Sequence, residues 1–249
     1  SRPRKLMPLP ACCTEPEALW PFAQPLPGAH LYSCRLDPAA LSSDAFALAG
    51  IRLPGHLQQA AAKRQSEFLA GRLCARAALH SHAQQPRDPD QDADGMPLWP
   101  AGLCGSITHS KGLAAAVVAS QEHWQGIGLD AELLMSASRA QRLAGQILTP
   151  DELQRLQHYP ESEQAWLVSL TFCSKESLFK ALFPLVGQRF YFQDAELLEC
   201  PADGQLQLRL LRDLAPQWPQ GSLLNGQQAM LGKHLLSLVS IAADHRLMT

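Results

Sequence analysis

The sequence has few charged residues and almost no excess of either sign. Of its 249 residues, 18% are Asp, Glu, Lys or Arg, and the formal net charge at pH 7 is −2. Proteins that bind nucleic acid nonspecifically rely on a marked basic excess, because their contacts are made to phosphates. Nucleic acid is therefore not an expected partner, and any site for an anion must be a local one.

Long hydrophobic runs and metal-type cysteine pairs are also missing. No apolar stretch approaches the ~20 residues of a membrane-spanning helix, and the basic start Ser1–Lys5 lacks the apolar segment of a signal peptide. The seven cysteines include the adjacent pair Cys12 and Cys13 but no Cys-x-x-Cys spacing. Free thiols in a reducing compartment are the expected state. We expect a cytoplasmic protein without stable membrane association.

Hydrophobic residues, by contrast, make up 46% of the chain, which is enough for a sizeable core. The length suits one compact unit or two closely fused halves. Apolar periodicity and turn residues predict a mixture of strands and helices, with a helix start signal at Thr149–Glu152. The expected strands are 29–36, 105–110, 113–119, 124–133, 189–199, 205–211 and 234–243, and the expected helices are 57–82, two within 136–170, and a central one from 172 that ends at Pro184.

The central helix, Phe172–Leu182, is notable because an apolar helix carries a charged pair. Glu176 and Lys180 are four residues apart, so their side chains project from one face. On a surface helix such a pair contributes only about a few tenths of a kcal/mol and needs no function. Here Leu178 and Phe179 place apolar side chains on more than one side, which indicates a buried helix whose charges need a partner, a ligand or a metal. From this stretch alone, a surface ion pair and a buried functional pair both remain open.

A second stretch, Gly126–Leu133, alternates as a strand does. Apolar residues face one side, and Gly128, Asp130 and Glu132 face the other. Two carboxylates on one face repel each other unless a cation lies between them or water separates them. Their oxygen atoms suit Mg2+, and the glycines leave space for a ligand to approach closely. The alternative is an exposed strand end with two solvated acids.

Candidate anion-binding groups occur in two places upstream. The expected long helix carries basic residues that form either a binding site or a solvated face: Lys63, Arg64 and Arg72. The end of the expected hairpin carries an imidazole and small hydroxyls that can donate hydrogen bonds to an anion: Ser106, Thr108, His109 and Ser110. Taken alone, His109 fits a structural histidine better than a ligand-binding one.

Three stretches stand in a fixed order: Gly-Ser-Ile-Thr-His-Ser at 105–110, Gly-Ile-Gly-Leu-Asp-Ala-Glu at 126–132, and Phe-Cys-Ser-Lys-Glu-Ser-Leu-Phe-Lys-Ala at 172–181. This arrangement strongly resembles the 4′-phosphopantetheinyl transferases, in the subgroup that serves peptide and siderophore synthesis. That family has a Ser/Thr-His step, then a Gly-Ile-Asp-x-Glu-like stretch, then a helix with Trp/Phe-x-x-Lys-Glu-(Ala/Ser)-x-x-Lys. Each motif alone is modestly specific, whereas all three in order are highly specific. The resemblance covers roughly residues 60–185.

The resemblance implies an α/β (α+β) fold made of two similar, pseudo-symmetric halves in one chain. Each half has a small antiparallel-rich sheet packed on a long helix, and we place the halves at 1–122 and 123–249. In the family, coenzyme A binds between the halves and Mg2+ joins its pyrophosphate to acidic residues. By motif position, the implied Mg2+ ligands are Asp130, Glu132 and Glu176.

The resemblance also implies individual roles. Glu176 is the implied base, directly or through a water molecule, and Lys180 the implied counter-charge for the pyrophosphate; with Asp130 they form the implied catalytic set. The residues implied to hold coenzyme A are Lys63, Arg64, Arg72, Ser106, Thr108, His109, Lys175 and Lys180.

The implied activity is Mg2+-dependent transfer of the 4′-phosphopantetheine arm from coenzyme A to a Ser of an apo acyl or peptidyl carrier protein, with release of adenosine 3′,5′-bisphosphate. The implied partners are coenzyme A and these carrier proteins, and we expect a monomer. Two alternatives remain: another Mg2+-dependent phosphotransferase, for which no Gly-rich phosphate loop is present, and a carrier-protein-binding module that has lost catalysis.

Overall fold

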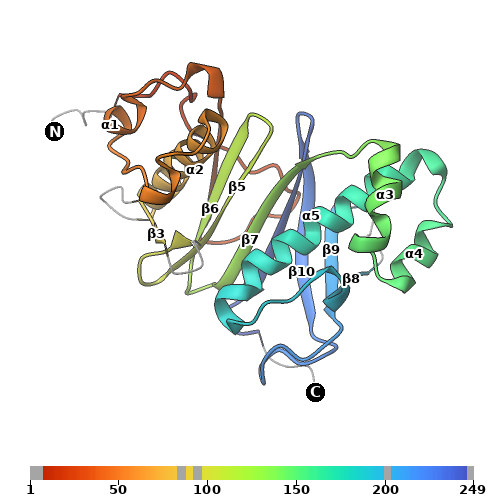
Figure 1. Cartoon of the computed structure of the whole chain (residues 1–249). Coiled ribbons are helices and arrows are strands. Elements are labelled where there is room, and N and C mark those ends of the chain that lie inside the picture. Colours follow the sequence, from red (N-terminus) through yellow and green to blue (C-terminus); the bar gives the residue numbers. More distant parts are fainter. Residues whose placement is uncertain (1–7, 83–87, 92–96, 199–202, 246–249) are drawn as a thin grey trace. The chain divides into compact units, whose positions relative to one another are not determined.

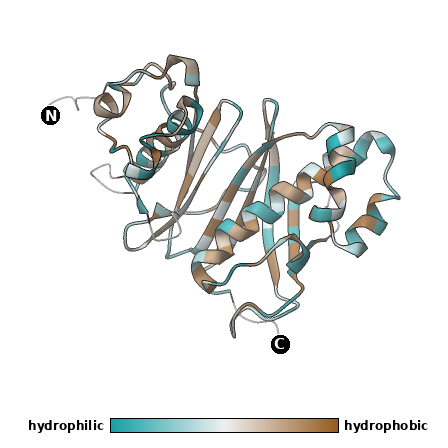
Figure 2. Ribbon diagram, in the orientation of Figure 1, coloured by the Kyte–Doolittle hydropathy of each residue, from teal (hydrophilic) through white to brown (hydrophobic). Residues whose placement is uncertain are grey.

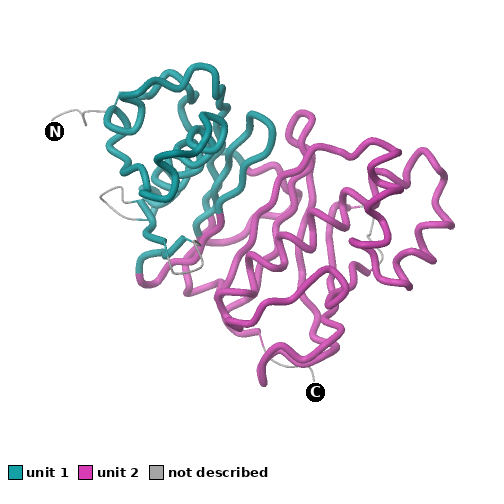
Figure 3. Tube along the Cα trace, in the orientation of Figure 1, with its two compact units in different colours: residues 1–19, 30–100, 107–118 teal, residues 20–29, 101–106, 119–249 magenta. Residues whose placement is uncertain are grey.

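The computed structural model describes residues 8–82, 88–91, 97–198 and 203–245. The chain divides into two compact units (Figure 3). Unit 1 comprises residues 1–19, 30–100 and 107–118, and unit 2 comprises residues 20–29, 101–106 and 119–249. Because two short earlier segments belong to unit 2, a single cut at residue 122 does not describe the units.

A four-stranded sheet in the order β1-β2-β6-β5 belongs mainly to unit 1 (Figure 1). Lys111 and Gly112 connect β5 to β6 with φ angles of 39° and 81°, which confirms the predicted hairpin. A short two-stranded sheet pairs β3 with β4. The elements are β1 (Glu17–Ala18), β2 (Ala29–Arg35), η1 (Pro38–Ala40), α1 (Ala45–Ala49), η2 (Gly55–Leu57), α2 (Ala62–His80), β3 (Asp90–Gln91), β4 (Pro97–Leu98), β5 (Leu103–Ser110) and β6 (Leu113–Ser120).

The core of unit 1 is formed by small and apolar residues of α2 and the sheet. Leu69 and Cys74 of α2 belong to the same buried cluster as Cys34 of β2 and Ala114 of β6. The long helix predicted at 57–82 is thus present as α2, but it begins later, because Gly55–Leu57 forms a separate 3-10 turn.

The six cysteines in the described part of the chain are free and buried. The Cys34 and Cys74 sulfur atoms lie 3.5 Å apart, and those of Cys12 and Cys13 lie 3.7 Å apart. Burial raises the pKa of Cys12 to about 12 and the pKa of Cys104 to about 12. The predicted free thiols are confirmed for these six residues.

Unit 2 contains a five-stranded antiparallel sheet in the order β7-β11-β10-β9-β8. The longest helix, α5, packs against β7 and β11. Figure 2 shows apolar residues along these strands and on α5. The elements are β7 (Trp124–Leu133), α3 (Ala137–Ile147), α4 (Pro150–Leu156), α5 (Glu161–Val186), η3 (Phe192–Asp194), β8 (Ala195–Leu197), β9 (Gln205–Leu210), β10 (Leu223–Leu231) and β11 (His234–Ala242).

The glycines of β7 are needed for the close approach of α5, and not for a ligand as we had expected. A Cβ atom on Gly128 would collide with the backbone carbonyl oxygen of Ser177, and one on Gly126 would lie 2.6 Å from the carbonyl oxygen of Ala181. Glycine removes this obstacle and lets the helix backbone lie directly on the strand. The face of β7 that carries Gly128 is therefore the face covered by α5.

Two predicted boundaries are wrong. The central helix does not end at Pro184 but continues to Val186, where Gly187 adopts a left-handed φ of 65° and closes the helix. The strand predicted at 189–199 is reduced to a 3-10 turn and the short strand β8, and its last position lies outside the described residues. The predicted start signal at Thr149 is confirmed, because Thr149 and Glu152 form a reciprocal capping box.

The mixed α/β class with antiparallel sheets and long helices is confirmed in both units. Among the described residues, no helix combines the length and the apolar character that a membrane span requires.

Candidate active site

The predicted site residues fall into two groups, one in each unit. In unit 2, Asp130 and Glu132 project from β7, and Glu176 and Lys180 project from α5, the helix that covers this strand. The Nζ atom of Lys180 lies 3.3 Å from Oδ1 of Asp130 and donates a hydrogen bond of 3.0 Å to the carbonyl oxygen of Leu129. The structure therefore brings the charged pair of the central helix to the acidic strand.

The carboxylates of this group influence one another. Burial and the negative charge of Asp130 raise the pKa of Glu132 to about 8. The same two causes raise the pKa of Glu176, and the positive charge of Lys180 partly opposes them. A carboxylate whose pKa is raised toward neutrality is a better proton acceptor than an ordinary solvated one. The shift in the pKa of Glu176 is in the direction that favours a general base.

The donor set fits a divalent cation in one respect. Oδ2 of Asp130 is buried and has no hydrogen-bond partner, which is costly unless a ligand reaches it. However, no three His, Cys, Asp or Glu side chains in the described ranges are close enough together to hold a metal by themselves. Mg2+ typically binds to one or two carboxylates and takes its other ligands from water and phosphate oxygens. The residues present fit such a site, and they do not form a closed three-carboxylate site.

Lys175 does not have the coenzyme A-binding position that the motif implied. Its side chain is 3% exposed, and its Nζ atom donates to Oε1 of Glu152 at 2.6 Å and to the carbonyl oxygens of Ile147 and Phe192, both at 2.8 Å. All three ammonium protons are used inside unit 2. Burial lowers the pKa of Lys175, and the carboxylate of Glu152 opposes that shift. A buried and fully bonded ammonium cannot also hold a phosphate.

Ser106 likewise has a structural partner. It lies within β5 and is buried, not at the end of the hairpin as we had predicted. Its hydroxyl accepts a 3.0 Å hydrogen bond from the backbone N–H of Leu129 and lies 3.5 Å from the carbonyl oxygen of the same residue. Ser106 thus fixes the backbone next to Asp130 and is not presented to a ligand.

In unit 1, Thr108 is buried in β5 and His109 is partly exposed. Nδ1 of His109 contacts Oε2 of Glu67, a residue of α2 that we had not predicted for the site. Glu67 lies inside the stretch of residues 60–185 that the resemblance covers, but none of the three motifs pointed to it. The carboxylate orients the imidazole, as acidic partners of functional histidines do.

The three basic residues of α2 have different environments. Lys63 and Arg64 are exposed at its first turn, whereas Arg72 is 5% exposed. The guanidinium of Arg72 donates to the carbonyl oxygen of Pro89 and lies 4.9 Å from the centre of the Phe68 ring. Burial lowers the pKa of Arg72. The predicted basic face is therefore divided into two exposed cations and one buried one.

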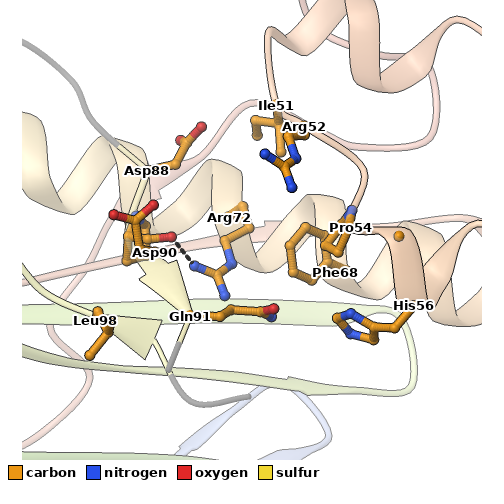
Figure 4. Close-up of a pocket in the computed structure, with 12 residues that line it drawn as sticks. Ile51, Arg52, Pro54, His56, Phe68, Arg72, Asp88, Asp90, Gln91 and Leu98 are labelled. Carbon is orange, nitrogen blue, oxygen red and sulfur yellow. Dashed lines mark hydrogen bonds between the residues drawn. The ribbon is translucent and has the colours of Figure 1, made fainter. Parts of the chain in front are cut away.

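Arg72 lines a pocket of about 730 Å³ within unit 1 (Figure 4). Arg52 and His56, neither of which we had predicted, contribute further basic groups to its wall, and Asp88 and Asp90 contribute carboxylates. Phe68 and Leu98 supply flat and apolar surface. The pocket can therefore accept a ligand that has both a ring and an anionic group.

A smaller hollow of about 190 Å³ adjoins Glu176 in unit 2. Phe179, Phe190 and Phe192 form part of its wall. Tyr191 also lines the hollow, and 68% of its surface is exposed. The ring centres of Phe179 and Phe190 are 5.2 Å apart. The candidate base thus lies beside an aromatic surface that suits an uncharged chain.

Comparison with known proteins assigns the family. Residues 53–119 match the model of the 4′-phosphopantetheinyl transferase N-terminal domain, and residues 126–238 match that of the 4′-phosphopantetheinyl transferase superfamily. Enterobactin synthase component D of Escherichia coli O157:H7 is 37% identical over 161 residues, which are 63% of this chain and 72% of that protein. The chain belongs to the 4′-phosphopantetheinyl transferase superfamily.

Other members of the superfamily match over a smaller share of their length. The 4′-phosphopantetheinyl transferase Svp of Streptomyces mobaraensis is 35% identical over 168 residues, 63% of each chain. The 4′-phosphopantetheinyl transferase PptT of Mycobacterium tuberculosis is 32% identical over 141 residues, 57% of this chain and 61% of that protein. The chain therefore spans less than two thirds of these two relatives. The family predicted from three short motifs is confirmed.

Proposed function

We propose that this superfamily member transfers the 4′-phosphopantetheine arm of coenzyme A to a Ser hydroxyl of an apo acyl or peptidyl carrier protein. Adenosine 3′,5′-bisphosphate leaves, and the reaction depends on Mg2+. The observation that carries the proposal is the charged cluster of Asp130, Glu132, Glu176 and Lys180 on β7 and α5. It lies within the part of the chain that matches the superfamily.

The residues of the cluster divide the work of phosphoryl transfer. Glu176, with its raised pKa, takes the proton of the Ser hydroxyl as that oxygen attacks the phosphorus next to the pantetheine arm. The bond from this phosphorus to the bridging oxygen breaks, and Lys180 supplies positive charge to the leaving phosphate. Asp130 and one neighbouring carboxylate would hold Mg2+, which when bound neutralises phosphate charge as a Lewis acid. Positioning and charge neutralisation are what this reaction requires most.

Each unit, taken by itself, contains a hollow whose lining matches one chemical group of coenzyme A. The aromatic hollow beside Glu176 suits the uncharged pantetheine arm. In the pocket of unit 1, Arg52 and His56 suit a phosphate, and Asp90 can accept from the amino group of an adenine ring. Asp88 is instead paired with Arg76 through both of its carboxylate oxygens. Thr108, His109, Lys63 and Arg64 stay predicted phosphate contacts.

The names of relatives suggest the first carrier proteins to test. One relative is named as a component of enterobactin synthase, so a carrier protein from siderophore synthesis is a natural acceptor. A carrier protein from fatty-acid synthesis is the second acceptor, because the proposal includes both classes. Cytoplasmic action as a monomer is part of the proposal.

The test is a mass-spectrometric assay of the acceptor. The protein is incubated with coenzyme A, Mg2+ and an apo carrier protein, and the carrier is expected to gain the mass of phosphopantetheine. A matched carrier with its acceptor Ser replaced by Ala should gain nothing, and chelation of Mg2+ should stop the reaction. An unmodified carrier after long incubation would reject the proposal.

The two alternatives predict other results in the same assay. A phosphotransferase of another kind would add phosphate alone to an acceptor. An inactive binding module would retain the apo carrier protein without changing its mass. The charged cluster argues against the second alternative, because a binding module does not need mutually repelling carboxylates in a buried place.

A further inference from the structure

The motif Lys175-Glu176 places two charged residues side by side on α5, and both line the aromatic hollow, but they differ in burial and in partners. Glu176 is partly exposed at the aromatic hollow, whereas the Lys175 side chain is 3% exposed and paired with Glu152, whose side chain is 4% exposed. Successive helical residues point about 100° apart. The direction in which Lys175 is held therefore sets the direction of Glu176.

The pair formed by Lys175 and Glu152 is complete in its hydrogen bonds. Oε1 of Glu152 accepts from the Thr149 backbone N–H at 2.8 Å as well as from Lys175, and Oε2 accepts from the Leu197 backbone N–H at 2.7 Å. Lys175 uses its other protons on two carbonyl oxygens. Because both side chains are buried and bonded to each other, neither charge is presented to a ligand.

These bonds join five elements at one point. The acceptors and donors belong to the last residue of α3, the first turn of α4, the 3-10 turn η3, the end of β8 and α5 itself. Phe192 and Ala195, in two of these elements, also line the hollow beside Glu176. The pair thus holds both the candidate base and the wall that faces it.

A buried ion pair is a poor device for stability alone, since well-packed apolar residues often serve as well or better. Its advantage is that it accepts only one arrangement of its partners. We infer that Lys175 and Glu152 form a positioning pair that fixes Glu176 and the Phe192 wall of the hollow for the transfer step. This inference rests on the proposed function, and it assigns Lys175 a place that does not touch coenzyme A.

The test uses variants that separate positioning from stability and from binding. Lys175→Met removes one charge and leaves the Glu152 carboxylate buried and unpaired, so its melting temperature should fall. The double variant Lys175→Met/Glu152→Gln removes both charges and leaves no buried unpaired carboxylate, so its melting temperature should lie above that of Lys175→Met, although the Gln amide can accept only one of the two backbone N–H bonds. Lys233→Met removes an exposed lysine of unit 2 as the matched control and should behave as the unchanged protein.

Kinetics with coenzyme A, Mg2+ and an apo carrier protein give the deciding measurement. In both Lys175 variants kcat should fall by about 10- to 100-fold, as expected when a reacting group is displaced, with little change in KM for coenzyme A. A double variant that regains normal kcat together with its melting temperature would show a structural role only. A raised KM for coenzyme A with unchanged kcat would make Lys175 a phosphate contact and overturn the inference.

Hydrogen exchange tests the same pair without turnover. Loss of the pair should speed exchange in the double variant at Leu197 and at residues 190–197, and leave exchange in β9–β11 unchanged. Identical exchange in the two proteins would overturn the inference even if the unchanged protein failed to modify any carrier. If the unchanged protein transfers nothing but these amides lose protection, only the proposed function is rejected.

Discussion

At the scale of single residues, Glu176 carries the sharpest expectation. Glu176→Gln keeps the size of the side chain but removes its charge. Single-turnover transfer should fall by ~10²–10⁴-fold, as is typical when a positioned acid–base group is lost. The melting temperature should change little, because a charge kept for function contributes little to stability. A near-normal rate for this variant would remove Glu176 from the chemistry, and a large fall in melting temperature would make it structural.

The raised pKa of Glu132 leads to a prediction of how the stability of the metal-free protein depends on pH. Its pKa of about 8 in the folded chain exceeds the ordinary value of 4.5, so the folded chain keeps a proton that the unfolded chain releases between these values. This contribution to stability is full below pH 4.5 and is lost as pH rises to about 8. Loss of this one proton lowers the free energy of unfolding by at most about 1.4 kcal/mol per pH unit. Urea unfolding at several pH values between 4.5 and 8 measures this free energy.

The control for this prediction is Glu132→Gln, which carries no proton to lose. Its unfolding free energy should vary less steeply with pH than that of the unchanged protein. Mg2+ should stabilise the unchanged protein most at the alkaline end, where its carboxylate ligands are ionised. Equal slopes for the two proteins would contradict the assigned pKa.

Arg72 and Arg52 line the same pocket but differ in exposure. We therefore expect their substitution to weaken ligand binding in different ways. Arg72→Ala breaks the bond to Pro89 and the contact with Phe68, and should weaken coenzyme A and 3′-dephospho-coenzyme A equally. Arg52→Ala removes an exposed cation and should weaken coenzyme A more if Arg52 meets the 3′-phosphate. Calorimetric titration of both ligands measures this. A selective loss in Arg72→Ala alone would restore our original assignment of Arg72 to the phosphate.

At the scale of elements, the contact of α5 with β7 decides whether the cluster forms. Gly128→Ala would place a Cβ atom against the backbone of Ser177, and backbone cannot rotate away as a side chain can. We expect a loss of about 1–3 kcal/mol, the usual cost of overpacking, together with a large loss of activity because Asp130 moves relative to Lys180. Thermal melts and single-turnover rates measure both effects.

The matched control is Gly145→Ala in α3. No atom lies within 4 Å of a Cβ built at Gly145, so alanine there should stabilise the helix by about 0.5–1 kcal/mol. If both glycine variants behaved alike, the close approach of α5 would not be the reason for Gly128.

Elements with a regular apolar pattern could be predicted from the sequence, and irregular ones could not. The alternation of β7 and the hairpin of β5 and β6 were visible in the residues themselves. β10 (Leu223–Leu231) was missed because Asn225-Gly-Gln-Gln228 interrupts its apolar residues. Gly226 is there because the carbonyl oxygen of Leu238 would lie 2.6 Å from any Cβ, a tertiary contact that leaves no local signal.

The sequence predicted which candidate residues lie together where their placement follows from their own face of an element. Glu176 and Lys180 share a helix face, and Asp130 lies on the strand face that meets it. Lys175 and Ser106 were assigned to coenzyme A by motif position, and both are used inside unit 2. The partner of Lys175 is 23 residues away, so no local pattern could show that its charge was neutralised.

At the scale of the whole molecule, both family models match within one chain, and we propose that the protein acts as a monomer. Light scattering should therefore give a mass near 27.2 kDa. The rate per mole should not depend on protein concentration. A dimer mass, with activity that falls on dilution, would contradict the expected monomer.

The buried cysteines matter for the proposed function, in which the protein would act on small thiols. Coenzyme A and a finished carrier protein both end in a free sulfhydryl group, and their oxidised forms can cap any accessible thiolate as a mixed disulfide. With pKa values of about 12, Cys12 and Cys104 supply almost no thiolate near neutral pH. All six described cysteines are also buried, so oxidised coenzyme A should add no mass to them in the folded protein, and the proposed donor would not cap the protein.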